Sequence, residues 1–376
     1  MKLEDIMMKT ILERVAKKAT EEQLDEEQIK KLIDAAIKAV TTDGLKNASA
    51  SLADTLRQQI PEMIAQERTM QEGFEQRLYD RWKKALDLYI AINLLTRESG
   101  EAFVKQHQAQ AVKDKDLVFG VLMRIHVRAC QTASAVGVLL KSGFARDALA
   151  RQRTLHELAA IAFFIKKHGQ ETAERYWLHN SIESYKAALQ YEQYCEKLGY
   201  THHDPGELDQ LRSRRDALIT RFGRVFNENY GWAAQALGKL RGTSFADVEK
   251  DVQLDHLRPY YRMASHGVHA NPKGLIFDIG NIDKEIPGYN RIMLAGASNA
   301  GLADPGQSAL ISLNQCTATF LTLKSDLETV MKLQVLNSFV DEACHAFVEI
   351  QHELEREEEE RITTMQTQDH PDQQDR

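Results

Sequence analysis

Hydrophobic residues recur every three or four positions along most of the chain, a pattern typical of amphipathic α-helices. The clearest example covers residues 62–99, where large apolar side chains would line one face of a single long helix. Pro61 is expected at the first position of this helix and Gly100 just beyond its end. The apolar positions that define the helix are Phe74, Leu78, Trp82, Ala85, Tyr89 and Ile92.

Other helices are predicted from the residues that begin and end them. Thr20, with Gln23 three positions later, indicates a capping box at the start of a helix that Gly44 ends. The sequence DPGE at 204–207 is a second start signal, a capping aspartate followed by proline, and DPGQ at 304–307 repeats it. The remaining helices are expected at 116–141, 145–168, 171–198, 306–331 and 334–361.

Helical periodicity disappears between Asn271 and Asp304. The segments GLIFDIG and NRIMLAG have the composition of strands, so a small β-hairpin or irregular insertion is expected near 275–300. The predicted fold is therefore an all-α multi-helix bundle. It has a helical N-terminal extension over residues 1–60, an all-helical core domain over 61–361 and a polar, disordered tail over 362–376.

Composition agrees with long helices and a sizeable core. The chain has 376 residues, of which 43% are hydrophobic, with only 20 glycines and 7 prolines to interrupt helices. The formal net charge of −7 is a poor match for a phosphate backbone, so contact with nucleic acid would need a local basic patch. The densest basic stretch, residues 212–224, either forms that patch or pairs with the acidic run at 353–360, and we favour the pairing.

The cysteines and the termini indicate a cytoplasmic protein. The four cysteines are far apart and form no CxxC motif, as expected for free thiols in a reducing compartment. The N-terminus lacks the apolar region of a signal peptide, and the longest apolar run, 158–165, is too short to span a membrane. No phosphate loop, dinucleotide-binding glycine pattern or kinase signature occurs, so no cofactor is predicted.

The stretch LRPYYRMASHGVHANPKG, residues 257–274, carries the densest set of candidate functional side chains. On a helix over 256–270, capped by Asp255, its arginines and histidines would share one face. Guanidinium and imidazole groups on one face suit an anionic ligand. The residues on this face are Arg258, Arg262, His266 and His269, with Ser265 at its edge and Tyr261 nearby. The HGVH pair lacks an HExxH glutamate. His202, His203, His256 or an acid could supply a third metal ligand, but no spacing indicates one, so no metal site is predicted.

A second group lies in RTLHELAAIAFF, residues 153–164. Arg153 and Glu157 stand four positions apart and can pair, with His156 between them, just before the helix becomes strongly apolar. Such a pair is either a structural bridge or part of a pocket, and the structural bridge is favoured for the pair alone. Arg175, near the start of the next helix, is a further ligand-binding candidate.

Three segments together resemble a bacterial family of all-helical proteins, domain-of-unknown-function family 5677 (DUF5677). They are ARQRTLHELAAIAFFI, RPYYRMASHGVHANP and LAGASNAGLADP, and the resemblance covers about residues 75–345. It implies an all-helical fold and no established activity.

Arg262 and His269, separated by six residues, are also similar to the arginine–histidine motif of HEPN-type ribonucleases. That similarity implies metal-independent RNA cleavage, in which His269 moves the proton and Arg262 stabilises the developing charge. His266 is the third catalytic candidate. The similarity to HEPN-type ribonucleases also implies a homodimer, in which the two copies of the chain together complete the site. It further implies a role as a toxin or antiviral effector. Met263 and Gly267 depart from the pattern.

Two functions therefore remain open. The first is a non-catalytic binding module for an anionic ligand or for a partner protein from a defence operon. The second is a HEPN-like ribonuclease effector that acts on RNA. We favour the binding module.

Overall fold

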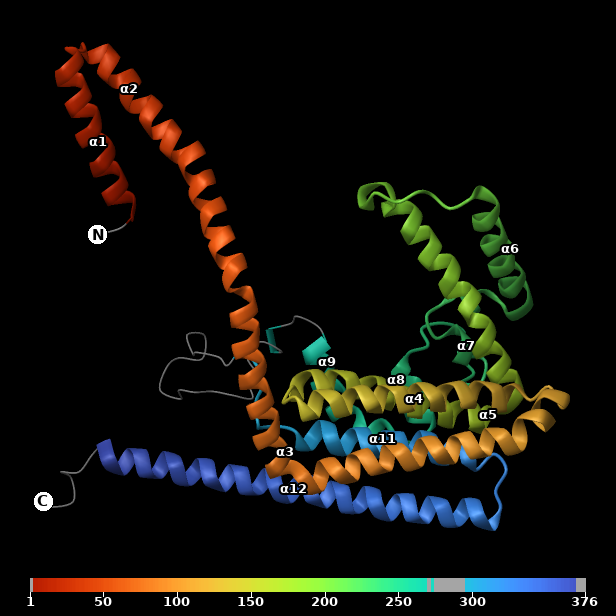
Figure 1. Cartoon of the computed structure of the whole chain (residues 1–376). Coiled ribbons are helices and arrows are strands. Elements are labelled where there is room, and N and C mark those ends of the chain that lie inside the picture. Colours follow the sequence, from red (N-terminus) through yellow and green to blue (C-terminus); the bar gives the residue numbers. More distant parts are fainter. Residues whose placement is uncertain (1–2, 269–271, 274–294, 370–376) are drawn as a thin grey trace, which may run out of the picture. The chain divides into compact units, whose positions relative to one another are not determined.

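The computed structural model describes residues 3–268, 272–273 and 295–369 (Figure 1). Within these ranges every regular element is a helix and no strand occurs, which confirms the all-α prediction. The hairpin expected near 275–300 falls largely outside the described residues. Contacts divide the chain into one unit, Met1–Phe74, and a second, Glu75–Arg376, whereas the predicted N-terminal extension ends at residue 60.

The N-terminal unit begins with α1 (Leu3–Glu22) and α2 (Glu26–Lys38), which pack against each other (Figure 1). Asp25 caps α2: its carboxylate accepts from the Gln28 backbone N–H at 2.8 Å, and the Gln28 side chain accepts from the Asp25 N–H at 3.0 Å. The capping box predicted at Thr20 is wrong. Thr20 lies inside α1, where its hydroxyl donates to the Ala16 carbonyl four residues earlier.

A π-helix, η1 (Ala39–Gly44), joins α2 to α3 (Leu45–Lys113), a single helix of 69 residues. The predicted start at Pro61 and stop at Gly100 are both wrong, because α3 continues through each of them. Gly100 does not end the helix but allows α3 to pack closely against His126. A Cβ added there would lie 2.2 Å from Cε1 of His126 on the neighbouring helix, so only glycine leaves room for that ring.

The core of the second unit contains α4 (Leu117–Lys141), α5 (Ala145–Tyr194), α11 (Ala303–Leu321) and α12 (Leu327–Asp369). Helices α4, α5 and α11 pack against one another, and α11 also packs on α12 (Figure 1). Fully buried small residues let these helices approach closely. They include Ala129, Ala133, Ala159, Ala160 and Ala309.

Helix α3 joins this core through two aromatic side chains. The Tyr89 hydroxyl donates to the Ala133 carbonyl at 2.8 Å, and the ring of Trp82 lies 5.8 Å from that of Phe347 on α12. Both aromatic residues were predicted to face the core, and both are buried.

Gly169 divides α5 into two helical segments, since its φ of 75° breaks the helical geometry. Four shorter helices follow: α6 (Pro205–Phe222), α7 (Gly231–Ala234), α8 (Phe245–Asp251) and α9 (Arg258–Val268). All four contact α5 and enclose a second apolar cluster. Its fully or nearly fully buried members include Phe164, Ile182, Phe226, Trp232, Phe245 and Val248.

The two DPG start signals have different outcomes. Asp204 caps α6 as predicted, and its carboxylate accepts from the Gly206 N–H at 2.8 Å. Asp304 does not cap α11, because that helix begins one residue earlier, at Ala303. At the C-terminus, α12 continues to Asp369, so residues 362–369 are helical although the sequence places them in a disordered tail.

No helix in the described ranges combines the length and the apolar composition that a membrane-spanning segment needs.

His126 of α4, which contacts Gly100, should make stability depend on pH. Burial lowers the pKa of His126 to about 4 from 6.5, so the unfolded chain takes up this proton at a higher pH than the folded protein does. The free energy of unfolding should therefore be highest above pH 6.5, the pKa of His126 in the unfolded chain. It should fall as the pH drops toward the pKa of His126 in the folded protein. The loss from this group reaches about 2 kcal/mol at pH 5.

Urea unfolding of the wild-type protein and of His126→Gln at pH 7 and pH 5 tests this expectation. The variant should lose less stability between the two pH values than the wild type. An equal loss in both proteins contradicts it.

Candidate functional site

A buried carboxylate lies at the centre of the polar residues between α5, α8 and α9. Glu249 of α8 is 0% exposed, and its Oε1 lies 2.8 Å from Nε2 of His156 on α5, which is itself 3% exposed. The other oxygen, Oε2, accepts from Nη1 of Arg258 on α9. A buried charge is tolerated only when it is paired and hydrogen-bonded, and both Glu249 oxygens have such a partner.

A second network lies beside the first. The Tyr261 hydroxyl donates to Oε1 of Glu157 at 2.8 Å and accepts from Nη2 of Arg153 at 2.7 Å. Arg153 also pairs with Glu157 at 3.1 Å, and its guanidinium lies 4.7 Å from the centre of the Tyr261 ring. Burial raises the pKa of Tyr261, and its hydrogen bond to Glu157 adds to the rise, so the hydroxyl keeps its proton.

The two networks are adjacent, since the rings of His156 and Tyr261 are 5.8 Å apart. Tyr230, just before α7, lies close to both. Burial raises the pKa of Tyr230 to about 12, and the negative charges of Glu157 and Glu249 contribute to the rise.

A pocket of about 240 Å³ opens beside these networks, between α5, α9 and α11. Its wall offers hydrogen-bond donors and acceptors as well as apolar surface. Partial burial raises the pKa of the Asp304 carboxyl group in this wall, and Glu355 adds to the effect. The lining residues are Gln152, His156, Leu257, Tyr260, Tyr261, Asp304, Gln307, Ser308, Ile311 and Ser312.

The arginines and histidines predicted to share one face of a helix over 256–270 have different surroundings, and the structure has α9 over Arg258–Val268. Arg258 turns inward to Glu249, whereas Arg262 is exposed and has no ion pair with any described residue. His266 is partly buried, and His269 lies outside the described residues. Ser265 donates its hydroxyl to the Tyr261 carbonyl at 2.7 Å, a bond within the helix.

Of the other candidates, Arg153 and Glu157 meet as predicted, and the structure adds Tyr261 to them. Arg175 makes its contacts elsewhere: it is buried over the rings of Phe222 and Phe226, and it donates to the Gln235 side chain at 2.6 Å. Burial lowers the pKa of Arg175.

Sequence reasoning missed Glu249, although a signal for it exists. Phe245, Val248, Glu249 and Val252 follow helical spacing, so Glu249 occupies a position where an apolar residue is expected. A carboxylate on an apolar face indicates a buried charge with partners, and here the partners come from α5 and α9.

Among the described residues, no ion pair joins the basic stretch at 212–224 to the acidic run at 353–360. Arg212 pairs with Asp209 at 3.3 Å, and Arg221 pairs with Glu174 of α5 at 2.9 Å. Within the acidic run, Glu357 pairs with Arg81 of α3 at 2.8 Å. The pairing favoured in the sequence analysis is therefore wrong, because each group finds partners on its own or a neighbouring helix.

The fold and the site define an all-helical protein with a buried charge network beside a polar pocket. Comparison with known families agrees with the sequence motifs: the model of a family of unknown function (DUF5677) matches residues 119–286. Residues 119–286 are therefore similar to the DUF5677 family, as the sequence motifs suggest. No curated protein and no solved structure matches the chain significantly.

The matched segment is shorter than the 75–345 range that the sequence motifs suggest, and the motif at 294–305 lies beyond it. Both charge networks fall within the match, whereas the α11 wall of the pocket falls outside it. The similarity to HEPN-type ribonucleases stays a prediction.

Proposed function

We propose that the protein is a binding protein whose pocket between α5, α9 and α11 takes a small polar molecule. The observation that carries this proposal is the combination of a pocket of about 240 Å³ with the buried Glu249, both of whose carboxylate oxygens are paired, directly behind its wall. Small-molecule sites generally combine apolar surface with a few fixed polar groups, which supply orientation and specificity. The network holds His156 and Tyr261 in place before a ligand arrives, so little ordering cost remains for binding.

Charge balance points to a neutral or zwitterionic ligand. Arg153 and Arg258 each pair with a carboxylate, so neither offers an uncompensated positive charge to the pocket. An anion of the kind expected from the sequence would have to compete with Glu157 and Glu249 for these guanidinium groups. A molecule with both hydrogen-bond donors and acceptors suits the amide, hydroxyl and imidazole groups of the wall.

A pocket-filling variant tests this proposal against a matched control. Ser308→Phe places an aromatic ring in the pocket, whereas Ser134→Phe makes the same change at an exposed position of α4. Melting temperatures would be measured with nucleosides, amino acids and sugars at millimolar concentration. A ligand at about 100 times its Kd should raise the free energy of unfolding of the wild type and of Ser134→Phe by about 2.7 kcal/mol, and that of Ser308→Phe far less.

Tyr260→Ala is a second variant, since this side chain lines the pocket, is 50% exposed and can be removed without opening the core. It should weaken binding of the same compound at an unchanged ligand-free melting temperature. Equal stabilisation of the wild type and both pocket variants, or no stabilisation by any compound, contradicts the proposal.

A ribonuclease effector in phage defence is the second candidate function, supported by the exposed Arg262, which has no ion pair within the described part of the chain. In this proposal Arg262 and His269 from two copies of the chain cleave RNA. Incubating the purified protein with labelled RNA should then give cleavage that His269→Ala abolishes. Light scattering should show a dimer for both the wild-type protein and His269→Ala. Intact RNA at high protein concentration contradicts this candidate.

A further inference from the structure

A group of side chains of the types that bind metals gathers where α5 ends. Glu192 and Cys195 are three residues apart, so they lie on the same face of the helix end. Gly199 then adopts a φ of 73°, and the Tyr200 N–H donates back to the Cys195 carbonyl at 2.9 Å. This reversal carries His202 and His203 back over the end of the helix.

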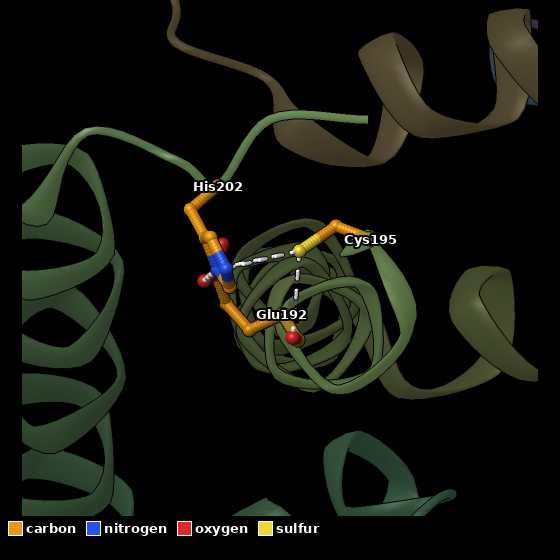
Figure 2. Close-up of side chains that lie close together, drawn as sticks. All are labelled: Glu192, Cys195 and His202. Carbon is orange, nitrogen blue, oxygen red and sulfur yellow. Dashed lines mark hydrogen bonds and ion pairs between the residues drawn. The ribbon is translucent and has the colours of Figure 1, made fainter. Parts of the chain in front are cut away.

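Three different ligand types converge there, as Figure 2 shows. The Cys195 sulfur lies 3.3 Å from Nδ1 and 3.7 Å from Nε2 of His202, and His202 Nδ1 lies 2.7 Å from Oε2 of Glu192. One ligand atom from each residue lies within 4.8 Å of the other two. A tetrahedral zinc ion with Zn–S of about 2.3 Å and Zn–N of about 2.0 Å separates sulfur from nitrogen by about 3.5 Å. The sulfur–nitrogen distances here already fall in that range.

Other side chains orient two of these ligands. Glu196 Oε1 lies 3.1 Å from His202 Nε2, which leaves Nδ1 of the same ring to face the sulfur and Glu192. His203 holds the other oxygen of Glu192, through its backbone N–H at 2.8 Å and its ring Nδ1 at 2.6 Å. A carboxylate on the far nitrogen of a histidine and hydrogen bonds to a ligating carboxylate are the outer contacts that metal ligands usually have.

We propose that Glu192, Cys195 and His202 form a zinc site, with the fourth position open to water or to another ligand. A thiolate and an imidazole select zinc over magnesium or calcium, which prefer oxygen ligands alone. The cysteine sulfur is buried, whereas the His202 side chain is 52% exposed, so an ion can enter from the histidine side. On binding, the metal replaces the proton between His202 and Glu192 and the proton of the thiol.

Metal titration of the full-length protein tests the site. The protein would first be treated with a chelator, then titrated with Zn²⁺, with bound metal measured by mass spectrometry. Co²⁺ would be titrated in parallel. We expect one Zn²⁺ per chain and a thiolate-to-cobalt charge-transfer band. Cys195→Ser should abolish the band and weaken Zn²⁺ binding by at least about 100-fold, and Glu196→Gln, which changes only an outer contact, by about 10–100-fold.

Cys344→Ser is the matched control, because Cys344 is a free cysteine on α12 outside this group. It should keep both the stoichiometry and the cobalt band. If Cys195→Ser fails to fold, His202→Asn provides a second test of the site. The His202 side chain is half exposed, so its replacement leaves the core intact. Zn²⁺ binding of equal affinity in the wild type, Cys195→Ser and His202→Asn, or no bound Zn²⁺ in the wild type, would overturn the proposal.

Discussion

Replacing Glu249 by alanine should lower the free energy of unfolding by about 3–5 kcal/mol, the usual cost of removing one partner from a buried ion pair. Glu249 is fully buried and is the shared acceptor of His156 and Arg258. Its removal leaves the Arg258 guanidinium without its anion and the His156 ring without its hydrogen-bond partner. Urea unfolding at pH 7, followed by circular dichroism, measures the loss.

Glu358→Ala provides the control for this experiment. Glu358 pairs with Arg361 at 3.0 Å on the exposed surface of α12, and exposed pairs contribute about 0–1 kcal/mol. A Glu249→Ala variant as stable as Glu358→Ala contradicts the structural role assigned to Glu249. The Glu249→Ala variant should also weaken ligand binding in the pocket, because Glu249 fixes the position of His156 in the pocket wall.

Gly100→Ala should lower the free energy of unfolding by about 1–3 kcal/mol, although alanine is the better helix former. Its Cβ would lie 2.2 Å from Cε1 and 2.7 Å from Nδ1 of His126, far closer than van der Waals contact allows. The His126 ring has little room to move, because it is itself buried and the ring of Phe320 lies 5.4 Å away. Helices α3 and α4 would have to separate to admit the methyl group.

Gly120→Ala is the matched control, with the opposite expected sign. Gly120 also lies in a helix, α4, but a Cβ added there has no neighbour within 4 Å. Alanine should therefore raise the free energy of unfolding by up to about 1 kcal/mol through helix propensity alone. Thermal unfolding of the two variants beside the wild type would reveal the contrast, and a shift of the same sign in both would refute the packing argument.

The pocket is assembled from segments far apart in the chain. His156 and Glu249 are 93 positions apart, and Gln152 and Ser312 are 160 apart. The α5 and α9 walls lie within the DUF5677 match, whereas the α11 wall lies outside it. Residues 119–286 alone would therefore lack Asp304, Gln307 and Ser308, so the full-length chain is the proper material for binding experiments.

The sequence by itself determined the all-α class and several helix boundaries. The helix predicted over 116–141 agrees with α4 to within one residue, and the Asp204–Pro205 signal predicts the start of α6. These predictions succeed because hydrogen bonding within a helix and at its cap involves neighbours at most four residues away. Local rules failed at Gly100, where a glycine that looks like a helix stop instead makes room for a ring on another helix.

Only the tertiary structure decided which polar residues act together. Arg258 and Arg262 are equivalent in the sequence, one turn apart on the same helix, yet packing of α9 against α5 turns the first toward Glu249 and leaves the second exposed. The hydrophobic periodicity of a helix indicates which of its faces is buried. It does not indicate which side chains of another helix contact that face. The pairing of Glu249 with His156 and Arg258 therefore could not be predicted from the sequence, because the pairing energy of a buried charge depends on groups that are distant in sequence.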